Sequence, residues 1–239
     1  MSVISAREEI LRDVKRALGR DGKPAPPHDR PDASSSSLAD QVSRINQNCE
    51  QQRRALVEQF ESELGRIGVR FHRATNAESA FQYIDQVRLA RESRTIVAWE
   101  AQVIADIQLG EKLSKKGVEF LTETSGPGFI RKTEAADIGV SGVDYGLADT
   151  GTLILLTRKG QARSISLLPP VHIAIVRPQQ ILSGLSDLFP LLRADANANG
   201  RDLSSAITFI TGPSRTADIE LTLVVGVHGP QQLHVLLLE

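Results

Sequence analysis

The sequence predicts an α/β protein with a mostly parallel sheet, which is covered by helices and extended by a β-hairpin region. From residue 38 onward, apolar residues at helical spacing alternate with short apolar runs that are typical of buried strands. The chain is 41% hydrophobic but only 4% aromatic, which is enough for a core built mainly from aliphatic side chains. A glycine-rich stretch between residues 138 and 157 interrupts the alternation and favours a hairpin.

The N-terminal part predicts an arm attached to the main domain. Residues 2–18 show the spacing of a short amphipathic helix, and residues 19–37 contain the prolines, glycines and serines of a linker. We therefore divide the chain into an arm, 1–37, and an α/β domain, 38–239. The apolar face of the helix must pack against another surface, either on its own domain or on another subunit. The linker length favours another subunit, so we expect a homo-oligomer formed through this arm.

The next elements alternate between helix and strand. Helical spacing over 38–67 indicates one long or two shorter helices, and helices are also predicted at 77–89 and 102–116. Apolar runs predict strands near 69–71, 95–99 and 118–121. Ligands of parallel sheets bind beyond the carboxyl ends of the strands, which draws attention to Trp99, Glu100 and residues 122–126. Glu123 is a candidate general acid or base, and the alternative for this residue is a solvated loop charge.

The stretch from 138 to 157 contains two strand-like runs on either side of a glycine-containing turn. Asp149, Thr150 and Gly151 stand in that turn, where glycine lets a ligand or another backbone approach closely. Asp149 is thus a catalytic candidate, and Thr150 and Gly151 are ligand-binding candidates. An ordinary turn with local hydrogen bonds explains the same residues and is favoured for this stretch by itself.

Two apolar strands are predicted in the last third of the chain. Pro169 and Pro170 impose an extended approach to the strand at 171–176, and His172 stands at its mouth as a candidate acid or base. The alternative is a hydrogen-bonded structural histidine. Helical spacing follows through 181–192, and the closing run at 233–238 is apolar enough to be a central strand.

The stretch 206–220 has the pattern of a strand, a tight turn and a helix that begins at Ser214. The free N–H groups of such a helix attract an anion, and Arg215 and Thr216 in its first turn would add to the site. Gly212 would let the ligand approach the backbone. Capping alone explains the same residues, because Ser214 can be an N-cap and Arg215 can pair with Asp218.

Composition excludes several functional classes. A net charge of −1 and few aromatic residues argue against nucleic-acid binding, and no apolar run is long enough to span a membrane. Cys49 is the only cysteine, so the chain cannot form an internal disulfide or supply the ligands of a four-cysteine cluster. The five histidines show no metal-ligand spacing, and dinucleotide, P-loop and serine-hydrolase motifs are absent. The charged N-terminal residues do not resemble a signal peptide, and we expect a cytoplasmic protein.

Three motif segments together resemble the lactate utilization protein C family, whose domain is called the LUD domain. They are residues 148–152, residues 166–173, and residues 214–220 with 226–230. The resemblance covers roughly 38–239, with one departure, Asp149, where the family more often has glutamate. It implies a fold similar to the sugar-phosphate isomerase and CoA-transferase group. It also implies a role in oxidising L-lactate to pyruvate beside two iron–sulfur partner proteins, with no cofactor in this chain.

Three hypotheses follow. The favoured one is a non-redox subunit of a lactate-oxidising complex that binds a small anion near Ser214 and Arg215. The second is an independent enzyme for a phosphorylated or CoA-linked small molecule, with Glu123, Asp149 or His172 as acid or base. The third is an assembly module without a ligand, in which the motifs only maintain the fold.

Overall fold

The computed structural model describes residues 6–17, 35–122, 128–198, 204, 206–217 and 223–239. The chain forms two compact units, residues 1–39 and residues 40–239. In the first unit, the predicted amphipathic helix is confirmed as α1 (Ala6–Ala17), on which Ile10, Leu11 and Val14 are exposed. The contribution of this arm to assembly stays a prediction. Within the described ranges, no helix is both long and apolar enough to cross a membrane.

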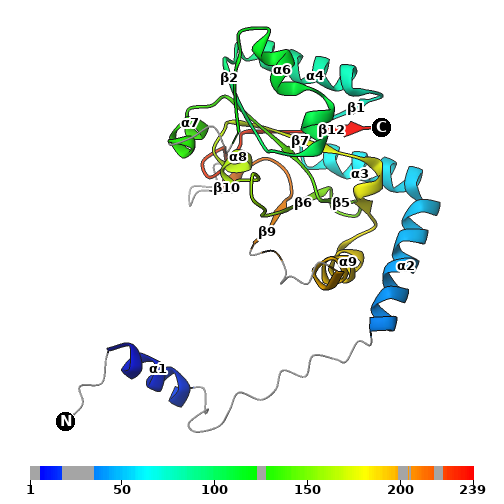
Figure 1. Cartoon of the computed structure of the whole chain (residues 1–239), viewed down its shortest axis with the longest axis vertical. Coiled ribbons are helices and arrows are strands. Elements are labelled where there is room, and N and C mark those ends of the chain that lie inside the picture. The colour runs from blue at the N-terminus through cyan, green and yellow to red at the C-terminus, as the bar shows by residue number, and fades with distance from the viewer. Residues whose placement is uncertain (1–5, 18–34, 123–127, 199–203, 205, 218–222) are drawn as a thin grey trace. The chain divides into compact units, whose positions relative to one another are not determined.

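The second unit alternates helices and strands, as Figure 1 shows. Its helices are α2 (Ser35–Gln51, which begins in the first unit), α3 (Arg53–Arg66), α4 (Ala77–Ala90), α5 (Gln102–Asp106), α6 (Leu109–Ser114), α7 (Phe129–Glu134), α8 (Ser164–Leu167), the 3-10 turn η2 (Pro178–Gln180) and α9 (Leu185–Ala198). Its strands are β1 (Arg70–Ala74), β2 (Thr95–Ala98), β3 (Glu119–Leu121), β4 (Ile138–Gly142), β5 (Tyr145–Leu147), β6 (Thr152–Leu156), β7 (Val171–Val176), β8 (Ile181–Leu182), β9 (Ile207–Ile210), β10 (Arg215–Ala217), β11 (Leu223–Val225) and β12 (Gln232–Leu238).

A six-stranded parallel sheet forms the centre of the fold and confirms the predicted class. Its strand order is β1-β12-β7-β4-β2-β3, and every neighbouring pair is parallel. The closing strand β12 lies between β1 and β7, so the prediction of a central strand is correct. All residues of β4 and β7 are buried, which explains why neither strand alternates between apolar and polar residues.

Helices cover both faces of this sheet (Figure 1). Helices α4 and α6 lie on one side, where Tyr83 of α4 contacts His72 of β1 and His234 of β12. On the other side lie α3, α8 and a four-stranded sheet of order β8-β5-β6-β9. A hairpin does form in the predicted region, as the antiparallel pair β5–β6, but its first strand is 145–147, which we expected in the turn. The run at 138–142, which we expected as the first strand, is β4 of the central sheet. Phe60 of α3 packs on Gly146 of β5, and this contact joins the second sheet to the aliphatic core.

Two predicted boundaries need correction. Ser35, Ser36 and Ser37, which we assigned to the linker, form the first turn of α2. The helix predicted at 102–116 is divided into α5 and α6, because Gln108 between them adopts a left-handed backbone with φ of 58°. Residues at helical spacing on both sides of such a break produce one uninterrupted pattern in the sequence.

The helix predicted to begin at Ser214 is wrong. Residues 215–217 form β10, which pairs antiparallel with β11. The N–H of Ser214 donates to Pro230, and the Ser214 carbonyl accepts from Gly226, so the backbone of Ser214 is used for pairing rather than for helix capping. The helix N-terminus on which the predicted anion site depended is therefore absent at residues 214–217.

Candidate functional site

A cavity of about 180 Å³ lies at the amino ends of β7 and β12, and we call it the motif pocket. Three segments that are distant in the sequence form its wall. The lining residues are Ser166, Leu167, His172, Thr208, Phe209, Ile210, Thr211, Gly212, Pro213, Ser214, His228, Gly229, Pro230 and Leu233. Three predicted site residues, His172, Gly212 and Ser214, thus meet at one place. Parts of the two motif segments near residues 166–173 and 214–230 also meet there.

His172 is a buried polar group in the wall of the motif pocket. It is the second residue of β7, it is 1% exposed, and its Nε2 lies 2.8 Å from the Ser141 hydroxyl on the neighbouring strand β4. Burial, with a smaller contribution from His234, lowers the pKa of His172 to about 3. The imidazole is therefore uncharged at neutral pH, where it is a hydrogen-bonding group and only a weak base.

The second ring nitrogen of His172 has no protein partner. Nδ1 is buried and makes no hydrogen bond to any residue in the described part of the chain. An unmet buried polar atom costs about 1–3 kcal/mol, and such atoms are rare in folded proteins. This makes His172 the member of the pocket that most needs an additional partner.

Close packing of α8 on β4 shapes one wall. Gly139 of β4 pairs with His172, and a Cβ at Gly139 would lie 2.0 Å from the carbonyl oxygen of Ile165. Only a residue without a side chain lets the α8 backbone approach the sheet so closely. This approach fixes the position of Ser166 and Leu167, which line the pocket next to Ile165.

The opposite wall joins two loops. Gly212 has φ of 92°, a left-handed conformation that favours glycine, and it turns the chain after β9 against Ile67. Ser214 then bonds through its N–H to Pro230, and its side chain packs beside Gly229. The contact between these loops places Ser214 and His228 in the same wall.

Arg215 lies outside this wall. Its guanidinium donates from Nη2 to the carbonyl oxygen of Ile67 at 3.0 Å, and Ile67 is the C-cap residue that follows α3. A cation at a helix carboxyl end is favourable, because the helix dipole places partial negative charge there. The exposed Arg215 therefore has a structural partner, and its role as an anion anchor stays a prediction. The backbone of Thr216 lies in β10, and its side chain is outside the described part.

The Asp149 turn lies next to the pocket but not in its wall. Asp149 and Thr150 are exposed, and a Cβ on Gly151 would lie 3.0 Å from the backbone of Leu64 in α3. Gly151 is thus explained by the close approach of another backbone, and this explanation needs no ligand. The Thr150 hydroxyl connects through Thr152 to Thr211, which lines the pocket, with both oxygen–oxygen distances 2.8 Å. The catalytic role of Asp149 and the ligand role of Thr150 and Gly151 stay predictions.

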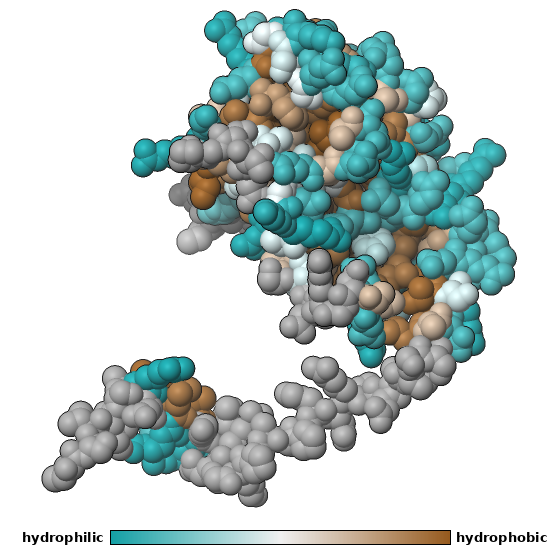
Figure 2. Space-filling view, in the orientation of Figure 1, coloured by the Kyte–Doolittle hydropathy of each residue, from teal (hydrophilic) through white to brown (hydrophobic). Residues whose placement is uncertain are grey.

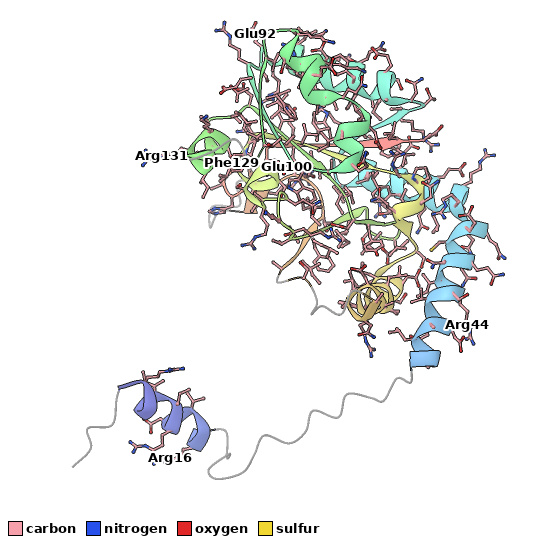
Figure 3. All side chains as sticks on the ribbon, viewed as in Figure 1. Arg16, Arg44, Glu92, Glu100, Phe129 and Arg131 are labelled. Atoms are coloured by element: carbon pink, nitrogen blue, oxygen red, sulfur yellow. The ribbon has the colours of Figure 1, made fainter. Side chains whose placement is uncertain are left out.

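Larger cavities lie at the carboxyl ends of the strands, where the sequence directed attention. A cavity of about 600 Å³ follows β2 and β3 and is lined by Trp99, Glu100, Gln108, Glu111 and Thr122 among others. Glu100, which Figure 3 labels, is exposed at the end of β2. A second cavity of about 250 Å³ beyond β4 and β7 includes Asp144 and Arg177. Glu123 lies outside the described residues.

Sequence reasoning missed Ser141, Ser166, Thr211 and His228 as site residues. Ser141 offered a signal, because a serine inside an apolar strand requires a buried hydrogen-bond partner. No local pattern marked Thr211, whose side chain joins the site through a contact with Thr152 that is 59 residues away in the sequence.

Comparison with known proteins places these observations in a family. Residues 57–238 match the family described as "LUD domain". The chain belongs to the LUD domain family. It is 34% identical to "Lactate utilization protein C" of Halalkalibacterium halodurans over 231 residues, which cover 95% of each chain. It is 31% identical to "Uncharacterized protein YkgG" of Escherichia coli over 234 residues, which cover 98% of each chain. The LUD match includes the whole motif pocket.

A solved structure has a similar fold. The crystal structure of a DUF162 family protein from Deinococcus radiodurans superposes on this LUD domain protein with a TM-score of 0.58 at 24% identity. The alignment covers 78% of this chain and 98% of the other one. The α/β architecture of this chain is therefore shared with an experimentally determined protein.

The buried histidines predict a pH-dependent stability. Burial lowers the pKa of His172 to about 3 and that of His234 to about 4, whereas an unfolded histidine has a pKa of about 6.5. Below about pH 6.5 the unfolded chain binds protons that the folded chain does not, so stability is complete above this pH and falls as pH decreases. Each histidine should contribute a loss of about 1.2 kcal/mol between pH 6 and pH 5.

Urea unfolding at pH 7, 6 and 5 measures this dependence. Replacing His172 with glutamine should reduce the slope in this interval, because one titrating group is removed. A wild-type stability that is equal at pH 7 and pH 5 would contradict the neutral, buried state of both histidines.

Proposed function

We propose that this chain is a non-redox subunit of a lactate-utilization complex, which supports the oxidation of L-lactate to pyruvate beside iron–sulfur partner proteins. The observation that carries the proposal is the 34% identity to a "Lactate utilization protein C" over 95% of both chains. The single cysteine agrees with this division of labour, because four-cysteine clusters need ligands that this chain does not have. In this proposal the motif pocket binds a small ligand with an anionic group.

The surface around the motif pocket supports a subunit role. Leu167 and Phe209 line the pocket yet are 42% and 45% exposed, and Leu168 and Val227, next in sequence to lining residues, are also exposed. Ile130 on the adjacent α7 is exposed as well, and Figure 2 shows apolar surface over this helix. Exposed apolar side chains that gather in one region are typical of a surface that binds another protein.

The second candidate is an independent enzyme for a phosphorylated or CoA-linked molecule. The cavity of about 600 Å³ at the carboxyl ends of β2 and β3 favours it by its size and position. Its described lining residues include Glu100 and Glu111 but no lysine or arginine. Such a lining disfavours phosphate, so the lactate-utilization role remains our first proposal. The likeness to sugar-phosphate isomerases and CoA transferases stays a prediction.

Deleting the gene and restoring it on a plasmid tests the proposed function. Growth on L-lactate as the sole carbon source should be lost on deletion and restored by the plasmid, while growth on glucose is unchanged. A tagged full-length chain should capture iron–sulfur proteins from cells grown on L-lactate. Normal growth on L-lactate together with capture of no iron–sulfur protein would overturn the proposal. Capture with normal growth would contradict an essential role and favour a module used only for assembly.

A further inference from the structure

We propose that the cavity of about 600 Å³ at the carboxyl ends of β2 and β3 binds a small organic ammonium ion, which carries its positive charge on a short apolar body. We call this cavity the edge cavity. It shares no described lining residue with the motif pocket, so the inference concerns a second site and does not depend on the proposed role in lactate utilization.

The edge cavity lies where ligands of parallel sheets usually bind. Strands β2 and β4 are neighbours, but in chain order the next strand of this sheet after β2 is β3, on one side, and the next after β4 is β7, on the other. Such a reversal opens a crevice at the carboxyl ends of the two strands. Trp99, Ala101 and Gln102, which follow β2, line both the edge cavity and the cavity beyond β4. The volume of the edge cavity is within the roughly 300–1,000 Å³ of small-molecule sites.

The inner wall of the edge cavity is apolar and aromatic. Ile104 of α5 and Leu109 of α6 are buried in it, and Gln108, whose left-handed backbone separates these helices, lines the same cavity. Phe120 of β3 is half-buried in this wall, and a Cβ at Gly110 would lie 2.9 Å from its ring. Aliphatic side chains pack against the apolar body of an organic cation, and aromatic rings attract its charge.

The rim of the edge cavity is negatively charged. Glu100 and Glu111 line the cavity and are exposed, whereas the exposed Gln102 and Gln108 are uncharged amides. Lysine and arginine are absent from the described wall. Glu111 pairs with Lys115 at 2.6 Å, but these side chains are 63% and 71% exposed, so water screens the pair. This distribution of charge favours an ammonium ion and repels a phosphate or a carboxylate.

Packing fixes the position of Glu100 at the rim. Its N–H donates to the carbonyl oxygen of Gly160 at 2.9 Å, and a Cβ at Gly160 would lie 3.0 Å from Glu100 Oε2. Gly160 has φ of 79°, so glycine suits both the backbone and the space that the carboxylate needs. The loop before α8 therefore supports Glu100, whose exposed side chain remains within reach of a ligand.

Fluorescence of Trp99 tests the proposal in the full-length chain, because Trp99 is the only tryptophan and lines the edge cavity. Phenethylammonium is the probe, and phenylethanol and phenylacetate are compounds of similar shape with no charge and with a negative charge. We expect a saturable change with phenethylammonium, a dissociation constant at least about tenfold higher with phenylethanol, and no binding of phenylacetate. The absence of a saturable change with phenethylammonium, or an equal affinity for the alcohol, would overturn the proposal.

Two glutamate variants separate binding at the rim from general attraction to an acidic surface. Glu100→Gln keeps the shape of the side chain and should weaken phenethylammonium binding at least about fivefold, with phenylethanol unaffected. Glu119→Gln is the matched control, because Glu119 is exposed on β3 but lies outside the described wall of the edge cavity. It should bind the probe like the wild type. Equal weakening in both variants, or none in Glu100→Gln, would refute the site. The comparison of the three compounds uses the wild type, so it decides the proposal even if a variant is unstable.

Discussion

Gly139→Ala is expected to destabilise the protein by about 3 kcal/mol or more and to lower its melting temperature by about 6–12 °C. The new Cβ would lie 2.0 Å from the Ile165 carbonyl oxygen and 3.1 Å from a ring atom of Pro169. Neither group is the end of a flexible side chain, so relief requires α8 to move away from β4. Such a movement would also disturb Ser166 and Leu167 in the motif pocket.

Gly65→Ala is the matched control for this prediction. Gly65 lies inside α3, is exposed and has open space where its Cβ would be. Alanine at such a helical position should stabilise the fold by about 0.5–1 kcal/mol. Thermal melts of the wild type and both variants measure the difference. Equal melting temperatures for Gly139→Ala and the wild type would show that α8 is not held against β4 as described.

The double variant Leu168→Glu/Val227→Glu is expected to abolish partner capture and growth on L-lactate. Both side chains are exposed, at 43% and 53%, and each is next in sequence to a residue that lines the motif pocket, so the folded chain tolerates charge there. If a partner protein covers this surface, two carboxylates would be buried without cations. We expect association to weaken by at least about 3 kcal/mol, which is more than a hundredfold.

Leu89→Glu is the control for this surface. Leu89 is 59% exposed on α4, which lies on the other side of the six-stranded sheet. This variant should capture partners like the wild type, and all variants should melt within about 2 °C of it, because surface substitutions usually change stability by less than about 0.5 kcal/mol. Capture that is unchanged in the double variant would exclude the pocket mouth as the partner surface. This result would not contradict the proposed subunit role.

The sequence by itself determined most of the central sheet. Strands β2, β7 and β12 were predicted within about two residues, because a strand buried on both faces is a continuous apolar run. The same local information failed at residues 214–217. Ser214 and the residues that follow it can start a helix or extend a strand. They form a strand because they pair with β11. The pairing partner is invisible to a local pattern, so the anion site that depended on the helix was also lost.

The candidate site shows the same division. His172, Gly212 and Ser214 were suggested by the sequence, because each stands where a strand or turn meets a special residue type. Only the tertiary structure showed that they share a pocket, that Arg215 contacts the end of α3, and that Ser141 bonds His172 from 31 residues away. Backbone preference acts over a few neighbouring residues, whereas cross-strand hydrogen bonds depend on strand order and register. Strand order and register are decided by how the whole core packs.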